Sequence, residues 1–168
     1  AEIHPNLFHK KGAIGAARTN NPERASSSTQ FYIVQGRVQN DSLLTHNQNR
    51  INQFLAGHFA TNDPANKPLL DSIAQARADE NQELARQLSA KWNQLSKDYR
   101  NFERYQIPEV HREVYQTLGG TPHLDQSYTV FGEVIEGLEI IDRIAAVETD
   151  RRDRPMTEVR VLSMKIIP

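Results

Sequence analysis

Apolar and polar positions alternate in residues 1–36, a pattern that predicts short β-strands. The clearest run is QFYIV, in which consecutive side chains point to opposite faces of a strand. Phe31 and Ile33 are expected to face the core. The opposite face carries Gln30 and Tyr32, a long amide beside an aromatic ring, and this pair is a candidate wall of a binding site.

The middle segment, residues 37–118, has a helical pattern. A first helix is expected over about 41–60 and a short one after Pro108, with breaks at Asp63-Pro64 and Lys67-Pro68. The simplest arrangement is an antiparallel helical hairpin whose apolar stripes pack together; a ligand groove along the stripe is the alternative. The longest stripe consists of Leu84, Leu88, Trp92, Leu95, Tyr99 and Phe102.

The last segment, residues 119–168, returns to strands and turns. Residues 128–134 alternate like a strand, and residues 138–145 have helical spacing. A turn is expected at Asp153-Arg154-Pro155, followed by a final strand over 159–167.

Composition excludes several classes of protein. The chain has 168 residues, with 20 Lys plus Arg against 21 Asp plus Glu, so it lacks the concentrated positive charge of a general nucleic-acid binder. Cysteine is absent, which excludes disulfides and thiolate metal sites. No apolar run approaches the roughly 20 residues of a membrane helix.

Familiar catalytic motifs are missing as well. The sequence has no phosphate-binding loop of the G-x-x-x-x-G-K-[ST] type, no H-E-x-x-H metal motif and no G-x-S-x-G elbow. We therefore expect no metal and no cofactor. Two possibilities remain: catalysis that depends only on shape and hydrogen bonding, or binding without catalysis. Five histidines are expected at the surface: His4, His9, His46, His58 and His111.

Two separated stretches resemble one known family. GAIGAARTNNPERASSSTQFYIVQG (12–36) and HLDQSYTVFGEVIEGLEIIDRI (123–144) resemble the cyclophilins, in the family's order, and DRPMTEVRVLSM resembles their closing turn and strand. The resemblance covers residues 1–36 and 119–168. It implies a mixed α+β fold: part of an antiparallel cyclophilin-like β-barrel with a capping helix, and residues 37–118 as an inserted helical hairpin.

The resemblance also implies an activity, the cis-trans isomerisation of peptidyl-prolyl bonds in protein folding. Gln30 aligns with the glutamine that hydrogen-bonds near the substrate carbonyl, and is the catalytic candidate. The remaining aligned positions are expected to bind substrate, Ala17 and Arg18 through their main chain: Ala17, Arg18, Thr19, Tyr32, His123, Leu124 and Tyr128. Phe31 and Phe131 align with core residues.

The chain departs from the family pattern at three points, one of which is Tyr32, where the family has a pocket phenylalanine. His123 stands where the family often has tryptophan. The Phe-His-Arg motif that carries the catalytic arginine is absent, and Lys10 is not assigned that role. We therefore expect upstream sequence in the natural protein, and much weaker activity from this chain alone.

The expected partners are proline-containing peptides or unfolded client proteins. The alternative is a non-catalytic module that binds proline peptides or acts as a scaffold, whose helical hairpin recruits a protein partner.

Overall fold

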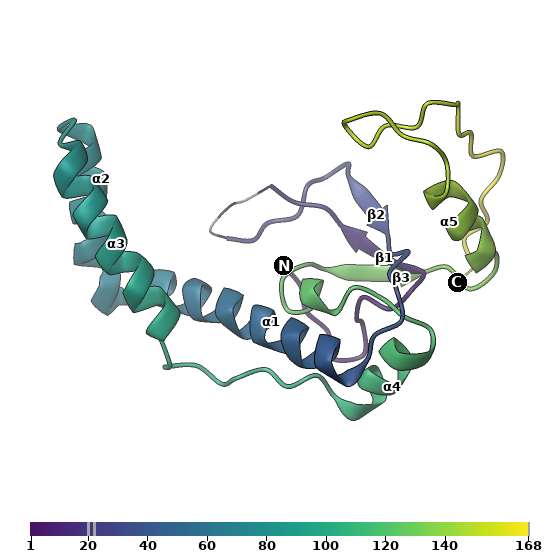
Figure 1. Ribbon diagram of the computed structural model, residues 1–168, viewed down its shortest axis with the longest axis horizontal. Coiled ribbons are helices and arrows are strands. Elements are labelled where there is room, and N and C mark those ends of the chain that lie inside the picture. Colours follow the sequence, from purple (N-terminus) through teal and green to yellow (C-terminus); the bar gives the residue numbers. More distant parts are fainter. Residues whose placement is uncertain (20, 22, 168) are drawn as a thin grey trace.

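Within residues 1–19, 21 and 23–167, which the computed structural model describes, the fold contains one three-stranded antiparallel sheet and five α-helices. β1 (Ala13–Ala16) lies between β2 (Phe31–Ile33) and β3 (Val130–Glu133) (Figure 1). Ile14 pairs with Ile33 on one side, and a register shift after Ile14 interrupts the ladder to β3 on the other.

The helices extend away from the sheet. α2 and α3 lie side by side as a hairpin, α1 runs from the sheet region toward that hairpin, and α4 lies beside the start of α1 (Figure 1). None of the described helices is both long and apolar enough to cross a membrane. The helices are α1 (Asp41–Asn62), α2 (Lys67–Ala78), α3 (Gln82–Asp98), α4 (Glu109–Thr117) and α5 (Leu138–Ala145), with the short 3-10 helices η1 (Pro64–Asn66) and η2 (Pro122–Leu124).

The helices expected near 41–60, along the long stripe, after Pro108 and over 138–145 are confirmed. Side-chain caps explain where two of them begin. The Asn40 side chain accepts a hydrogen bond from the main-chain N–H of Leu43 at the start of α1, and Asn81 accepts one from Leu84 at the start of α3.

One predicted break is wrong. Lys67-Pro68 was expected to interrupt the helical pattern, but α2 begins there with Pro68 in its first turn. A proline in the first turn removes no hydrogen bond, because the first N–H groups of a helix have no partner inside it.

Aromatic residues join α1 to the end of α3, as expected for packing between helices. Phe102 lies beyond the end of α3 and stacks on Phe59 of α1, with ring centroids 5.4 Å apart. Tyr99 stacks on the other side of Phe102 at 6.5 Å.

The segment between α3 and α4 is fastened to α1 by buried amide groups. The Asn52 side chain donates to the carbonyl of Tyr105 at 2.8 Å and accepts from its N–H at 2.9 Å. The Gln48 side chain accepts from the N–H of Ile107 at 2.9 Å. These bonds satisfy main-chain groups that have no secondary-structure partner, and they fix where α4 begins.

Two small apolar clusters form the core. The first joins Ala13, Val34 and Val130, from β1, the end of β2 and β3, and Tyr32 packs against it. The second cluster joins the N-terminal segment, α1 and α4. Its members are Leu44, Ile107 and Tyr115, with Phe8 and Tyr105 packed against them.

The expected core face of β2 is only partly buried. Phe31 is 58% exposed, but Ile33 on the same face is half-buried. On the opposite face Tyr32 is half-buried, and Val34, just after β2, is buried. Phe131 of β3, also expected in the core, is 58% exposed. Alternation placed Phe31 and Tyr32 on opposite faces correctly. It could not tell which face the rest of the chain covers, and β1 and β3 gather their buried residues on the Tyr32 side.

The predicted final strand is also wrong, although the turn before it is confirmed. The N–H of Asp150 bonds to the carbonyl of Arg154 at 2.8 Å. Residues 159–167 form no strand in the structure, and Leu162 and Ile166 are each 89% exposed. A strand needs a neighbour to pair its main-chain groups, and the described chain places none beside this segment.

Two glycines, Gly36 and Gly120, allow two chain segments to pass close to each other between the two clusters. Gly36 has a left-handed φ of 62°, and a Cβ atom there would lie 2.6 Å from the carbonyl carbon of Gly120. Gly57, in the middle of α1, is a contrasting case: apart from its chain neighbours and the backbone of its own helix, no atom lies within 4 Å of the position that a Cβ would take.

We predict that Gly36→Ala lowers the free energy of unfolding by about 2–4 kcal/mol, because the methyl group meets main chain in an unfavourable backbone conformation. The control Gly57→Ala should raise it by about 0.5–1 kcal/mol through helix propensity. Urea unfolding followed by circular dichroism measures both. A Gly36→Ala protein as stable as the parent would contradict the close contact.

Candidate functional site

A buried carboxylate organises the region beside the sheet. Asp125, just after η2, is 4% exposed, and its Oδ1 accepts hydrogen bonds from the main-chain N–H and from Nδ1 of His9, at 3.0 and 2.7 Å. Its Oδ2 accepts from the hydroxyl of Tyr115 in α4 at 2.7 Å. Three donors compensate the carboxylate for the loss of water, which a buried anion requires.

The network continues into the sheet. Nε2 of His9 lies 2.8 Å from the hydroxyl of Tyr32 on β2. The tautomer that donates Nδ1–H to Asp125 leaves Nε2 to accept a hydrogen bond from the Tyr32 hydroxyl. Burial, and then the neighbouring Tyr128 and Asp125, raise the pKa of Tyr32, so its hydroxyl keeps its proton.

Sequence reasoning missed three residues of this network: His9, Tyr115 and Asp125. His9 was expected at the surface but is 1% exposed, and His111, also expected there, is 8% exposed. The His111 ring stacks on Phe8 with centroids 3.8 Å apart, and burial lowers its pKa. The local signal was weak, because the sequence neighbours of a histidine give no indication of a distant carboxylate.

Tyr32 lies flat across the sheet because its neighbour has no side chain. Gly15 of β1 pairs directly with Tyr32, and a Cβ at Gly15 would collide with the phenol ring. Glycine inside a strand is a general signal of such a close approach.

Three of the predicted site residues meet in the structure. The rings of Tyr32 and Tyr128 are 6.0 Å apart and nearly perpendicular, at 84°. The guanidinium of Arg18 lies 4.7 Å from the centroid of the Tyr128 ring, and it donates to Oγ of Ser127 at 2.9 Å. This arrangement is a cation–π contact on an edge-to-face aromatic pair.

α1 packs against this group through the ring of Phe54. The guanidinium groups of Arg18 and Arg24 lie 6.0 and 5.9 Å from the ring centroid of Phe54 in α1. Burial, and then the charge of Arg18, lower the pKa of Arg24. Arg24 is held by the carbonyl of Gln126 at 2.8 Å.

The β1–β2 hairpin is closed by two of the predicted site residues, Ala17 and Gln30. The N–H of Ala17 donates to the carbonyl of Gln30 at 3.0 Å, and the carbonyl of Ala17 accepts from Ser27 at 2.7 Å. The side chains of Gln30 and Thr19 are exposed. Both main-chain groups of Ala17 are therefore already paired, whereas no hydrogen bond to the Arg18 main chain occurs within the described residues.

The last two predicted residues lie in η2. The carbonyl of Leu124 accepts hydrogen bonds from the N–H groups of Ser127 and Tyr128, so η2 fixes the position of Tyr128. His123 lies toward α1: burial lowers its pKa, and the positive charge of Arg50 lowers it further.

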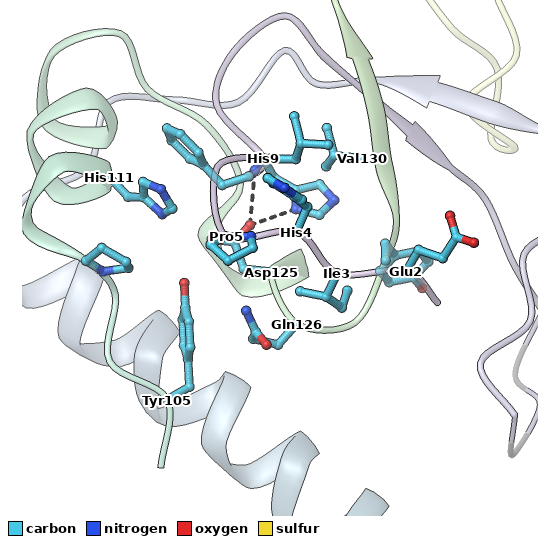
Figure 2. Close-up of a pocket in the computed structure, with 14 residues that line it drawn as sticks. Glu2, Ile3, His4, Pro5, His9, Tyr105, His111, Asp125, Gln126 and Val130 are labelled. Carbon is cyan, nitrogen blue, oxygen red and sulfur yellow. Dashed lines mark hydrogen bonds and ion pairs between the residues drawn. The ribbon is translucent and has the colours of Figure 1, made fainter. Parts of the chain in front are cut away.

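A cavity of about 360 Å³ adjoins this network. His9 and Asp125 line one side of it, and Tyr105 and His111 point in from the segment that leads into α4 and from α4 itself (Figure 2). Of the predicted site residues only Tyr128 lines it. Nowhere in the described chain do three or more His, Asp or Glu side chains form a group that could hold a metal ion.

Comparison with known families adds a second line of evidence. Residues 108–166 match the family of cyclophilin type peptidyl-prolyl cis-trans isomerases. The matched stretch contains three predicted site residues: His123, Leu124 and Tyr128. The match begins before Gly119, so it also includes α4 and Tyr115.

Several curated cyclophilin-type proteins are similar over the same length. The peptidyl-prolyl cis-trans isomerase CYP18-2 of Arabidopsis thaliana is 44% identical over 55 residues, which is 33% of this chain and 34% of that protein. The isomerase-like 1 proteins of Emericella nidulans and Neurospora crassa are 42% and 40% identical, each over 55 residues, 33% of this chain and 34% of the relative. The chain thus spans about a third of these relatives.

We predict that Tyr115→Phe lowers the free energy of unfolding by about 1–3 kcal/mol, because Asp125 loses one of its buried donors. Tyr99→Phe is the matched control, since it also removes a hydroxyl bonded to an aspartate, Asp63, but at a half-buried place. Tyr99→Phe should lower the free energy of unfolding by less than Tyr115→Phe does. If urea unfolding showed equal decreases in the free energy of unfolding for both variants, the Asp125 network would contribute no more to stability than the Tyr99–Asp63 bond.

Proposed function

We propose that the protein carrying this sequence is a peptidyl-prolyl cis-trans isomerase of the cyclophilin type that assists protein folding. The observation that carries the proposal is the family match of residues 108–166. The fold supports it, because Tyr128 from the matched stretch lies against Tyr32 and Arg18 from outside it. Those are residues that the resemblance independently assigned to one site.

We also propose that residues 1–36 and 119–168 form part of a cyclophilin-like antiparallel β-barrel, and that 37–118 are a helical insertion. The sheet supports this division: β1 and β2 come from the first piece and β3 from the second, and all three pair antiparallel. α1, α2 and α3 lie wholly between the two pieces.

The proposed reaction suits a site without a nucleophile. Rotation about the X–Pro amide has a barrier of roughly 18–20 kcal/mol, because resonance gives the C–N bond double-bond character. No bond breaks, so the site only has to bind the twisted amide more tightly than either planar form. Preorganised hydrogen-bond donors and an apolar wall suffice for that.

The residues divide these tasks between them. In this proposal the Gln30 amide hydrogen-bonds near the substrate carbonyl, and Thr19 lies in the groove for the preceding residues. Tyr32, Leu124 and Tyr128 form the wall for the proline ring, with His123 at its edge.

The preceding substrate residue would bind to main chain. Because the N–H and carbonyl of Ala17 are bonded within the hairpin, the Arg18 main chain is the better candidate for that contact. The Arg18 side chain instead packs against the face of the Tyr128 ring.

We predict that Gln30→Ala slows cis-trans exchange of a short X-Pro peptide by roughly tenfold or more, because the twisted amide loses a positioned donor. Exchange spectroscopy by NMR, on the protein at its natural length, measures the rate. Gln87→Ala is the control: Gln87 is exposed on α3 and bonds only to Glu83 among the described residues.

An unchanged rate in Gln30→Ala would overturn the assignment of the site. Tight peptide binding by the unmodified protein without any acceleration of exchange would favour the binding module over the isomerase.

A further inference from the structure

A second hollow lies between α1 and the two chain segments that pass each other at Gly36 and Gly120. Its volume is about 530 Å³. We call it the α1 groove. Its polar and charged lining includes Gln35, Arg37, His46, Arg50, Thr121 and His123.

The α1 groove is positively charged. Arg37 and Arg50 line it, and none of the described residues that line it is acidic. Neither arginine forms an ion pair with any residue in the described part of the chain. Asp41, the single carboxylate in the sequence of α1, is engaged elsewhere, with Arg112 of α4 at 2.7 Å.

The floor of the α1 groove is built from buried polar groups. Asn47 and Gln39 are 7% and 5% exposed, and the Asn47 amide donates to the side-chain oxygen of Gln39 at 3.2 Å. Gln39 in turn donates to the carbonyls of Arg37 and Gly120, at 2.9 and 3.3 Å. The hydroxyl of Thr121, also in the lining, is buried without a hydrogen-bond partner in the described chain.

The groove adjoins the candidate site. His123 lines the groove, and the next residue, Leu124, belongs to the predicted proline wall. Gln35 follows β2, which carries Tyr32. The α1 groove and the predicted site thus share His123, and a peptide at that site that extends past His123 would reach the positively charged groove.

We propose that the α1 groove binds the carboxylate of an Asp or Glu side chain in the same proline-containing polypeptide, close in sequence to its proline. The inference rests on the proposed function, since it assumes that a proline peptide occupies the neighbouring site. Two arginines without a partner supply the charge complementarity, and the Thr121 hydroxyl and the groove amides supply further hydrogen bonds.

The test compares fluorescent X-Pro peptides in which one Glu is moved stepwise away from the proline on either side, each matched by a Gln peptide. Fluorescence anisotropy gives the dissociation constants. At the favoured position the Glu peptide should bind about fivefold more tightly than its Gln partner, and the preference should shrink between about 0.05 and 0.5 M salt.

The variant carrying Arg37→Gln and Arg50→Gln should lose this preference. It keeps the main-chain bonds between Arg37 and Gly120. The control carries Arg86→Gln and Arg151→Gln, the same change in net charge at exposed positions outside the α1 groove. The control should keep the preference.

Equal binding of Glu and Gln peptides at every position, or a preference that survives in the Arg37/Arg50 variant, overturns the inference. If exchange of the proline bond is still accelerated in that case, the proposed function stands without it. If no peptide binds and no exchange is accelerated, the proposed function fails and the inference fails with it.

Discussion

The arrangement of this chain depends on one buried carboxylate. Asp125 accepts hydrogen bonds from the main chain and ring of His9 and from the hydroxyl of Tyr115. An ionised carboxylate is tolerated in a protein interior only when donors replace its water, and these donors come from the N-terminal segment and from α4. Both elements must therefore dock together on the loop after η2. His9 is also hydrogen-bonded to Tyr32, so the position of Tyr32 depends on the same docking.

Close main-chain contacts make that docking possible. Gly36 and Gly120 bring two distant segments together where any side chain would collide, and Gly15 leaves room for the Tyr32 ring. The result is that Tyr32, Tyr128 and Arg18 converge, although they lie far apart in the sequence.

The helical segment is joined to the site at both of its ends. α1 supplies the Phe54 ring beneath Arg18 and one wall of the α1 groove, and α4 supplies Tyr115 to Asp125. The α2–α3 hairpin projects away from these contacts (Figure 1). Removing the whole segment would therefore disturb the candidate site as well as the hairpin.

The sequence by itself determined the local elements. Helical periodicity and the alternation in β2 and β3 are properties of neighbouring residues, and they located α1, α3, α4, α5 and two of the strands, but not α2. The candidate site was predicted from the resemblance of the motifs around Gln30 and Leu124. Only the tertiary structure decided which face of β2 is buried, that residues 159–167 remain unpaired, and that His9 is interior. These outcomes depend on partners distant in the sequence: a strand face is buried only where another segment covers it, and His9 is buried where it meets the carboxylate of Asp125.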